Sequence, residues 1–383
     1  MQRIALLDII RGFAILGTLG TNIWIFASSK TFVTAEPVIL ESLTLMLVDG
    51  KFLGMLTILF GVGLEIKYRQ ALRNQLAWPW IYIWSSFILL LDGVLHYVLL
   101  VDFDILRGYA ITAMIVSFLV SRSERVIKSA MCIALTYHIG SLVLLPRLFT
   151  RQDYDDSSSY YVYPDTWFGQ MQSRLDAIFD PTAEWISVIP MSVFLFLCGV
   201  LLMRRGAFVS DANGRRIQKK LLMWGIGIGL PLNAIAYLHK YMSHTVLDLG
   251  GLDRYVFAPM LAFGYMGLIA WRWRHPRITW LSSRMMEVGK TALTCYILQN
   301  LLASVLFYSW GLGFATIIGG SSALIISSWL GICVILMLFA HLWLKKFKIG
   351  PFELTLKWWS ELPQRRWSIY SQKEEVARRF VDK

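Results

Sequence analysis

The segment Leu6–Ser28, LLDIIRGFAILGTLGTNIWIFAS, is an almost unbroken apolar run with an ion pair near its start and an asparagine further along. About 20 apolar residues in a helix are enough to cross a membrane. Arg11 and Asn22 are about three helical turns apart and face one side of that helix, which Asp8 shares. Ionisable groups in a spanning helix are costly unless they pair or face a polar cavity. The sequence therefore predicts a membrane helix that carries a functional site or a structural clamp.

The composition of the whole chain indicates the same environment. Apolar residues make up 56% of the 383 residues, charged residues make up 16%, and the mean hydropathy is +0.54. Soluble domains carry roughly 25% charged residues. We therefore expect an all-α, polytopic integral membrane helix bundle, and because no small-residue cleavage site follows the first apolar run, we expect that run to be retained.

Apolar runs of about 20 residues predict the membrane spans. There are about ten of them, at residues 6–28, 45–66, 78–101, 107–121, 129–148, 185–203, 221–238, 255–273, 289–308 and 321–344.

The distribution of Lys and Arg predicts the orientation, because cytoplasmic loops hold an excess of these residues. With the N-terminus inside, 28 of the 37 Lys and Arg residues fall on the cytoplasmic side and eight on the outer side. Both termini are therefore predicted to be cytoplasmic in a multi-pass protein of the cell inner membrane. The excess of Lys and Arg on the cytoplasmic side explains the net charge of +12. Binding of nucleic acid is therefore not expected.

Two stretches lie outside the predicted spans. Residues 149–183 form an acidic outer loop within a transmembrane bundle that extends over residues 1–344. The loop could cap an outward-facing site. Its aromatic residues could stack on a sugar or could anchor the loop at the membrane interface; they are Tyr160, Tyr161, Tyr163 and Trp167. Residues 345–383 alternate basic residues with tryptophans, which is typical of an amphipathic cytoplasmic tail that lies on anionic membrane lipids.

The third predicted span contains two titratable residues, Asp92 and His96, four residues apart on one helical face. A carboxylate that orients a histidine is the arrangement used in general-base catalysis, and it also suits a proton relay. Asp104 and Arg107 follow in the next loop. A buried pair that only fixes helix packing is the structural alternative.

Polar residues also interrupt the ninth predicted span, at Thr291, Thr294, Gln299 and Asn300. Such residues commonly form hydrogen bonds between membrane helices, worth about 1 kcal/mol each. The chain shows no phosphate-binding loop and no zinc-type spacing of His and Cys, so no metal site is expected.

An ordered set of motifs resembles the YeiB-like family of bacterial inner membrane proteins. The set is Leu7–Gly17 with Asn22, Gly50–Phe52, Leu59–Gly63, His96, Asp104–Leu106, Tyr109, Ala292–Gln299 and Gly350–Glu353.

The first helix resembles that of transmembrane acyltransferases more widely, including the type-three acyltransferases that acetylate cell-surface glycans. In that group a catalytic histidine follows the arginine at the spacing that separates Arg11 from Asn22 here. Because this chain has asparagine in that place, either the base comes from elsewhere or the chemistry differs.

The resemblance and the polar residues together predict an integral membrane acyltransferase. In this hypothesis an acyl group, expected to be acetyl from cytoplasmic acetyl-CoA, is passed to an acceptor at the outer face, a glycan, lipid or small molecule. His96 is the general base, oriented by Asp92 or Asp104, and Asn22 stabilises the oxyanion. Arg11, with Asp8 and Gln299 in the same candidate donor site, pairs with CoA phosphates.

Two alternatives from other functional classes remain open at this stage. A proton-coupled transporter or exporter would also use buried Asp and His residues and helices broken by Gly and Pro. A non-catalytic membrane protein would use the same polar groups for packing alone.

Overall fold

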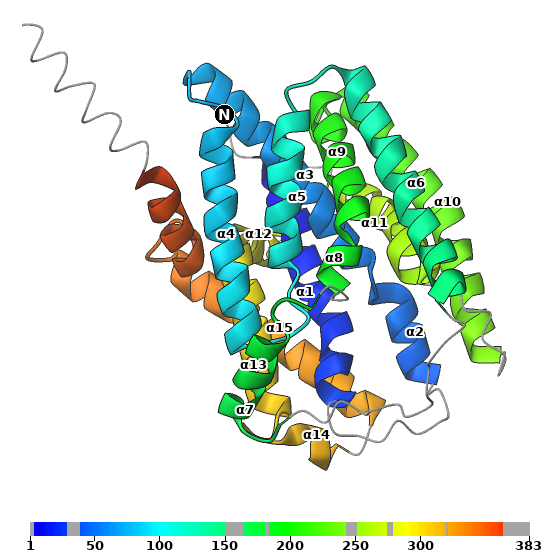
Figure 1. The fold of residues 1–383 in the computed structure, drawn as a ribbon, viewed down its shortest axis with the longest axis vertical. Helices are drawn as coiled ribbons and strands as arrows, with labels where there is room; N and C mark the ends of the chain where they lie inside the picture. The colour runs from blue at the N-terminus through cyan, green and yellow to red at the C-terminus, as the bar shows by residue number, and fades with distance from the viewer. Residues whose placement is uncertain are drawn as a thin grey trace, which may run out of the picture.

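The computed structural model describes residues 4–28, 39–149, 164–180, 184–242, 251–273, 279–318 and 321–362. Within these ranges every regular element is a helix, which confirms the all-α prediction. The long helices run between two ends of a bundle. α1 begins at one end, and α7 and α14 lie at the other (Figure 1); we call these the α1 end and the α7 end.

The helices are named in chain order, and the last one, residues 351–362, is called the tail helix. The others are α1 (Ala5–Ser28), α2 (Ile39–Val48), α3 (Lys51–Arg73), α4 (Trp80–Leu99), α5 (Leu106–Leu119), α6 (Glu124–Phe149), α7 (Trp167–Asp176), α8 (Glu184–Ser187), α9 (Ile189–Arg204), α10 (Ala212–Met242), the π-helix η1 (Asp253–Phe257), α11 (Ala258–Arg272), α12 (Trp280–Lys290), α13 (Ala292–Phe307), α14 (Phe314–Ile317) and α15 (Ser322–Leu344).

Six helical segments among the described residues are long and apolar enough to cross a membrane, or seven if α12 and α13 form one bent span. α5 and α9 coincide with predicted spans but have only 14 and 16 residues. They are therefore about 21 and 24 Å long, whereas a hydrocarbon core is about 30 Å thick. The chain is thus a multi-pass membrane protein by length and composition of its helices, but the count of ten spans is not confirmed.

α1 lies at the centre of the bundle, and most of its side chains are buried. α3, α12, α13 and α15 pack around it. α6 and α10 lie along one edge of the bundle and α4 along the opposite edge (Figure 1). These outer helices expose large apolar side chains such as Ile133 and Trp224, as expected of helices that face lipid.

Glycines allow several helix pairs to pack with their backbones in contact. A Cβ atom on Gly61 of α3 would lie 1.9 Å from the Phe196 carbonyl oxygen, and one on Gly199 of α9 would lie 2.1 Å from the Ile58 carbonyl oxygen. The α3–α9 crossing therefore requires a hydrogen in place of a side chain on both helices, which is the small-residue packing of membrane interfaces.

We expect Gly61→Ala to destabilise the protein by about 1–3 kcal/mol, because the added methyl group overpacks this crossing. The measurement is thermal unfolding of detergent-purified protein. The matched control is Gly63→Ala on the same helix, where an added Cβ meets nothing within 4 Å. The control should be neutral or slightly stabilising because alanine favours helix. Equal losses in both variants would contradict this account of the crossing.

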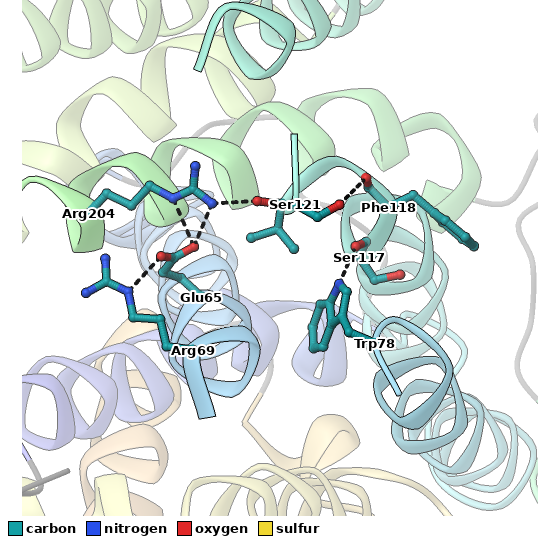
Figure 2. A network of polar contacts seen from close by, with 8 residues as sticks. Glu65, Arg69, Trp78, Ser117, Phe118, Ser121 and Arg204 are labelled. Carbon is teal, nitrogen blue, oxygen red and sulfur yellow. Dashed lines mark hydrogen bonds and ion pairs between the residues drawn. The ribbon is translucent and has the colours of Figure 1, made fainter. Parts of the chain in front are cut away.

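A buried carboxylate joins three helices at the α1 end of the bundle (Figure 2). Glu65 of α3 accepts hydrogen bonds from Arg69 Nε at 2.8 Å and from Arg204 Nε of α9 at 3.1 Å. Arg204 also donates to the carbonyl oxygen of Val120, at the end of α5. Nearby, Trp78 Nε1 donates to the Ser117 carbonyl oxygen at 2.9 Å. Since a buried charge is tolerated when it is paired, this network fixes the ends of α3, α5 and α9 relative to one another.

Candidate functional site

His96, near the end of α4, is a buried titratable residue with a partner for each of its ring nitrogens. Its Nδ1 lies 2.8 Å from Asp104 Oδ1, and the two residues are only 4% and 2% exposed. Its Nε2 lies 3.1 Å from Asn300 Nδ2 of α13. With Asn300 Nδ2 as the donor, Nε2 is the acceptor and Nδ1 carries the proton that Asp104 accepts. The nitrogen that could act as a base therefore points toward α13.

The turn between α4 and α5 brings Asp104 to His96. Asp104 Oδ2 accepts the backbone N–H of Arg107 at 3.1 Å, and so it satisfies an otherwise unpaired donor in the first turn of α5. A Cβ on Gly93 would lie 2.9 Å from that same nitrogen. The missing side chain at Gly93 lets the start of α5 approach α4 closely, which positions the carboxylate beside the histidine.

Arg107 packs against the same carboxylate and is itself buried. Its Nε lies 3.9 Å from Asp104 Oδ2. Its guanidinium carbon lies 3.6 Å from the centre of the Tyr97 ring and 5.2 Å from the Trp185 ring, a cation–π arrangement. Asp104 therefore contacts two partners, the histidine and the arginine.

α7 covers the end of α4 next to His96. Arg174 Nη1 donates to the Val98 carbonyl oxygen at 2.9 Å, and Trp167 Nε1 donates to the Leu99 carbonyl oxygen at 2.8 Å. These are two of the carbonyls that a helix leaves unpaired at its C-terminus. α7 thus packs against the end of α4 next to the histidine. α7 belongs to residues 164–180, the main part of the predicted outer loop that the structure describes; Tyr160, Tyr161 and Tyr163 lie outside the described residues.

Of the two carboxylates predicted to orient His96, the structure places Asp104 beside it. Asp92 lies one helical turn earlier on α4 and makes no hydrogen bond to His96 among the described side chains. Its Oδ2 atom is buried without a hydrogen-bond partner in that part of the chain. Asp92 lies on the same face of α4 as Ser85, Leu89 and His96, because these residues follow one another at intervals of three or four positions.

Asp8 and Arg11 form an ion pair with 3.1 Å between Asp8 Oδ1 and Arg11 Nη1. Arg11 also donates to the Gly289 carbonyl oxygen at 3.4 Å. Gly289 is at the end of α12, where the chain turns by 90° into α13, and a Cβ there would lie 1.8 Å from the Asp8 carbonyl oxygen. The ion pair therefore packs against a break in the ninth predicted span.

The carboxylate of Glu353, from the tail helix, caps α13 on the other side of this break. Its Oε1 accepts the backbone N–H groups of Leu293 at 2.7 Å and Thr294 at 3.3 Å, and its Oε2 accepts the Thr294 hydroxyl at 2.6 Å. A negative charge is favoured at a helix N-terminus. In the sequence Glu353 is only the last residue of the Gly350–Glu353 motif. Its role as a cap of α13 follows from a contact between residues about 60 positions apart.

A cavity of about 660 Å³ lies at the α1 end of the bundle, between α1, α3, α4, α5, the α12–α13 break and the tail helix. Four cationic side chains line it, against two acidic ones, and most of its remaining wall is apolar. The cations are Arg11, Lys67, Lys290 and Lys357, and the acids are Glu353 and Glu361.

The cavity approaches the histidine through Tyr296 of α13. Tyr296 lines the cavity together with Ile105 and Leu106, and its ring centre is 5.1 Å from that of His96. His96 and Asp104 themselves do not line it. One tyrosine side chain therefore stands between the cavity and the histidine–carboxylate pair.

The other predicted site residues are distributed as follows. Arg11 lines the cavity, whereas Asp8 and Gln299 do not. Asn22 is 8% exposed on α1, and it makes no hydrogen bond to His96 or Asp104 within the described residues. The structure thus brings together His96 and Asp104, and separately Asp8 and Arg11. It adds Asn300, which the sequence shows only as a polar residue within an apolar span.

Comparisons of the sequence with known proteins show what the chain is similar to. Residues 202–363 match the model of a family described as "Protein of unknown function (DUF418)". The chain is 23% identical over 413 residues to the uncharacterized protein YxaH of Bacillus subtilis (strain 168), covering 98% of each chain. It is 28% identical over 380 residues to the uncharacterized protein YeiB of Escherichia coli (strain K12), covering 92% of this chain and 95% of YeiB.

Proposed function

Since this chain is a YeiB-like membrane protein, as its motifs predicted, we propose that it is an integral membrane acyltransferase. It takes an acyl group, acetyl in the simplest case, from cytoplasmic acyl-CoA and transfers it to an acceptor that reaches His96 from the opposite side of the membrane. The observation that carries the proposal is the cavity that ends at Tyr296, in contact with a buried, carboxylate-oriented histidine.

The chemistry of the cavity suits a donor with a phosphorylated head and an apolar, uncharged reactive end. Lys67 and Lys290 form no ion pair with any described acid, and Lys67 Nζ lies 5.4 Å from the Tyr82 ring. Phosphate groups pair well with such ammonium and guanidinium donors. The apolar wall beyond them, formed in part by Leu59, Leu106 and Tyr109, would accommodate the pantetheine arm and the acyl chain.

The reaction follows from the histidine geometry. The acceptor hydroxyl gives its proton to His96 Nε2 while its oxygen attacks the thioester carbonyl carbon. The C–S bond then breaks, and the proton passes from the imidazolium to the leaving thiolate, so the products are an ester and free CoA. Asp104 stabilises the transient imidazolium.

We propose an orientation in the membrane from the distribution of Lys and Arg residues. The α1 end faces the cytoplasm of a cell with an inner membrane, both termini are cytoplasmic, and the short helices complete about ten crossings. This is supported by the 28-to-8 excess of Lys and Arg on that side. The cavity then opens toward the compartment that holds acyl-CoA, and α7 lies at the outer face.

The test is binding of acetyl-CoA to detergent-purified protein by calorimetry. Gly63 lines the cavity and has no atom within 4 Å of an added Cβ, so Gly63→Leu is expected to fill part of the cavity and weaken binding at least tenfold with the fold intact. Gly331→Leu is the matched control, because Gly331 on α15 is equally unobstructed and does not line the cavity. Arg11→Ala should weaken binding further. A well-folded wild-type protein that does not bind acetyl-CoA would refute the proposal.

The 90° break between α12 and α13 favours a second candidate, a proton-coupled transporter. Transporter sites are commonly built at broken helices near the membrane centre, and here the break is capped by the Glu353 carboxylate. This candidate predicts substrate-dependent proton uptake by reconstituted vesicles and no acyl transfer, and the acyltransferase predicts the reverse.

A further inference from the structure

α13 carries buried polar groups that the proposed donor site does not use. Gln299 is 0% exposed, and neither its Oε1 nor its Nε2 has a hydrogen-bond partner among the described residues. Ser304 is also 0% exposed, and its Oγ is likewise unpaired there. Buried polar groups are nearly always paired with protein, water or a ligand, so these two side chains require partners that lie outside the protein chain described.

Asn300 connects these unpaired groups to the atom that would act as the base. By helical spacing Asn300 and Ser304 lie in one row on α13, and Gln299 lies about 100° around the helix from Asn300. Asn300 Nδ2 is 3.1 Å from His96 Nε2, and Ser304 is one turn further toward the α7 end. Tyr296 belongs to the same face and lines the cavity, whereas the other three residues do not. The polar face therefore continues from the end of the donor cavity, past His96, toward the outer side.

The unpaired atoms define what could bind there. Gln299 Oε1 only accepts hydrogen bonds and Gln299 Nε2 only donates them. A thioester carbonyl, a carboxylate or a phosphate only accepts and would leave Oε1 unpaired, and an ammonium only donates and would leave Nε2 unpaired. A neutral hydroxyl group does both. The local chemistry thus selects an uncharged alcohol, or water in its absence.

We propose that Gln299, Asn300 and Ser304 form the acceptor site, which binds the hydroxyl end of a neutral alcohol beside His96 Nε2. The role of this site in binding an acceptor rests on the proposed acyl transfer, whereas the existence of the polar site does not depend on it. It assigns Gln299 to the acceptor and not to the donor, since Gln299 lies on the far side of Tyr296 from the phosphate-binding cations.

The first experiment tests the site without any assay of transfer. In a background in which Cys132, Cys198, Cys295 and Cys333 are replaced by alanine, Ser304→Cys is treated with 2-hydroxyethyl methanethiosulfonate, a neutral reagent that carries a hydroxyl group. We expect labelling at least tenfold faster than for Leu301→Cys, on the lipid-facing side of the same helix. Equal rates would overturn the proposal, whatever the protein catalyses.

The second experiment separates acceptor binding from packing. Gln299→Met removes both unpaired polar atoms at nearly constant shape, so thermal stability and acetyl-CoA affinity should be unchanged or higher. With 1-octanol as the acceptor probe, the KM for the alcohol should rise at least tenfold; Leu301→Met is the control and should change neither quantity. An unchanged KM in a variant that still transfers acetyl groups would refute the acceptor site. If Ser304→Cys is labelled faster than Leu301→Cys but the wild type transfers acetyl groups to no alcohol, the polar site stands and the proposed acyl transfer fails.

Discussion

Replacement of His96 by glutamine is expected to lower the rate of acetyl transfer by about 10²- to 10⁴-fold, the usual contribution of a general base. Glutamine keeps a polar side chain opposite Asp104 and Asn300, so both buried partners retain a hydrogen-bonding group. The measurement is the release of free CoA from acetyl-CoA in the presence of an alcohol, with detergent-purified protein. Acetyl-CoA affinity should be unchanged, because His96 does not line the cavity.

Two carboxylate variants test the geometry around the histidine. Asp104→Asn should reduce the rate nearly as strongly, because a neutral amide at that position no longer stabilises the imidazolium or pairs with Arg107. Asp92→Asn should have a much smaller effect, since Asp92 makes no hydrogen bond to His96. A larger loss in Asp92→Asn than in Asp104→Asn would exclude Asp104 as the orienting group.

Reversal of two charges in the cavity, Lys67→Glu together with Lys290→Glu, is expected to weaken acetyl-CoA binding by about 10²-fold or more. Each charge-assisted hydrogen bond to a phosphate is worth about 1.5–3 kcal/mol, and every 1.4 kcal/mol corresponds to about tenfold in affinity. Both lysines line the cavity and pair with no described acid. Calorimetry measures the dissociation constant directly.

The matched control reverses two exposed charges that do not line the cavity, Lys219→Glu and Lys220→Glu on α10. It changes the net charge equally, so it should alter binding only through long-range electrostatics, which salt screens. Equal weakening in both double variants at physiological ionic strength would mean that the cavity lysines do not contact the phosphates.

The apolar composition was enough to predict the class of fold, because this prediction depends on apolar runs in the sequence and not on contacts between distant residues. Every predicted span overlaps a helix, as with residues 6–28 and α1 (Ala5–Ser28), since an apolar run in a membrane must satisfy its backbone hydrogen bonds internally. The spans 45–66, 185–203 and 289–308 each include a break between two helices. Hydropathy placed a short span at residues 107–121, where α5 has 14 residues, but it does not reveal that the ninth span bends by 90° after Lys290.

The pairing of the site residues shows a similar limit. Asp92 and Asp104 were equally good candidates in the sequence, because Asp92 is four residues from His96 and Asp104 is in the next loop. The choice of Asp104 depends on Gly93, which lets the start of α5 lie against α4, and on the capping of Arg107 N–H by the same carboxylate. The cap has a local signal, an aspartate three residues before an amide in the first turn of a helix, but the close approach at Gly93 depends on how α4 and α5 cross.

The sequence by itself determined that this is an all-α membrane protein and that Asp8, Arg11 and His96 are unusual within it, because an ionisable residue inside an apolar run is visible in the local composition. Only the tertiary structure decided which groups meet. Asn300 is 204 residues from His96 and Glu353 is 60 residues from Leu293. Such pairings depend on how helices cross, and the crossings are set by glycines and side-chain shapes on several helices at once.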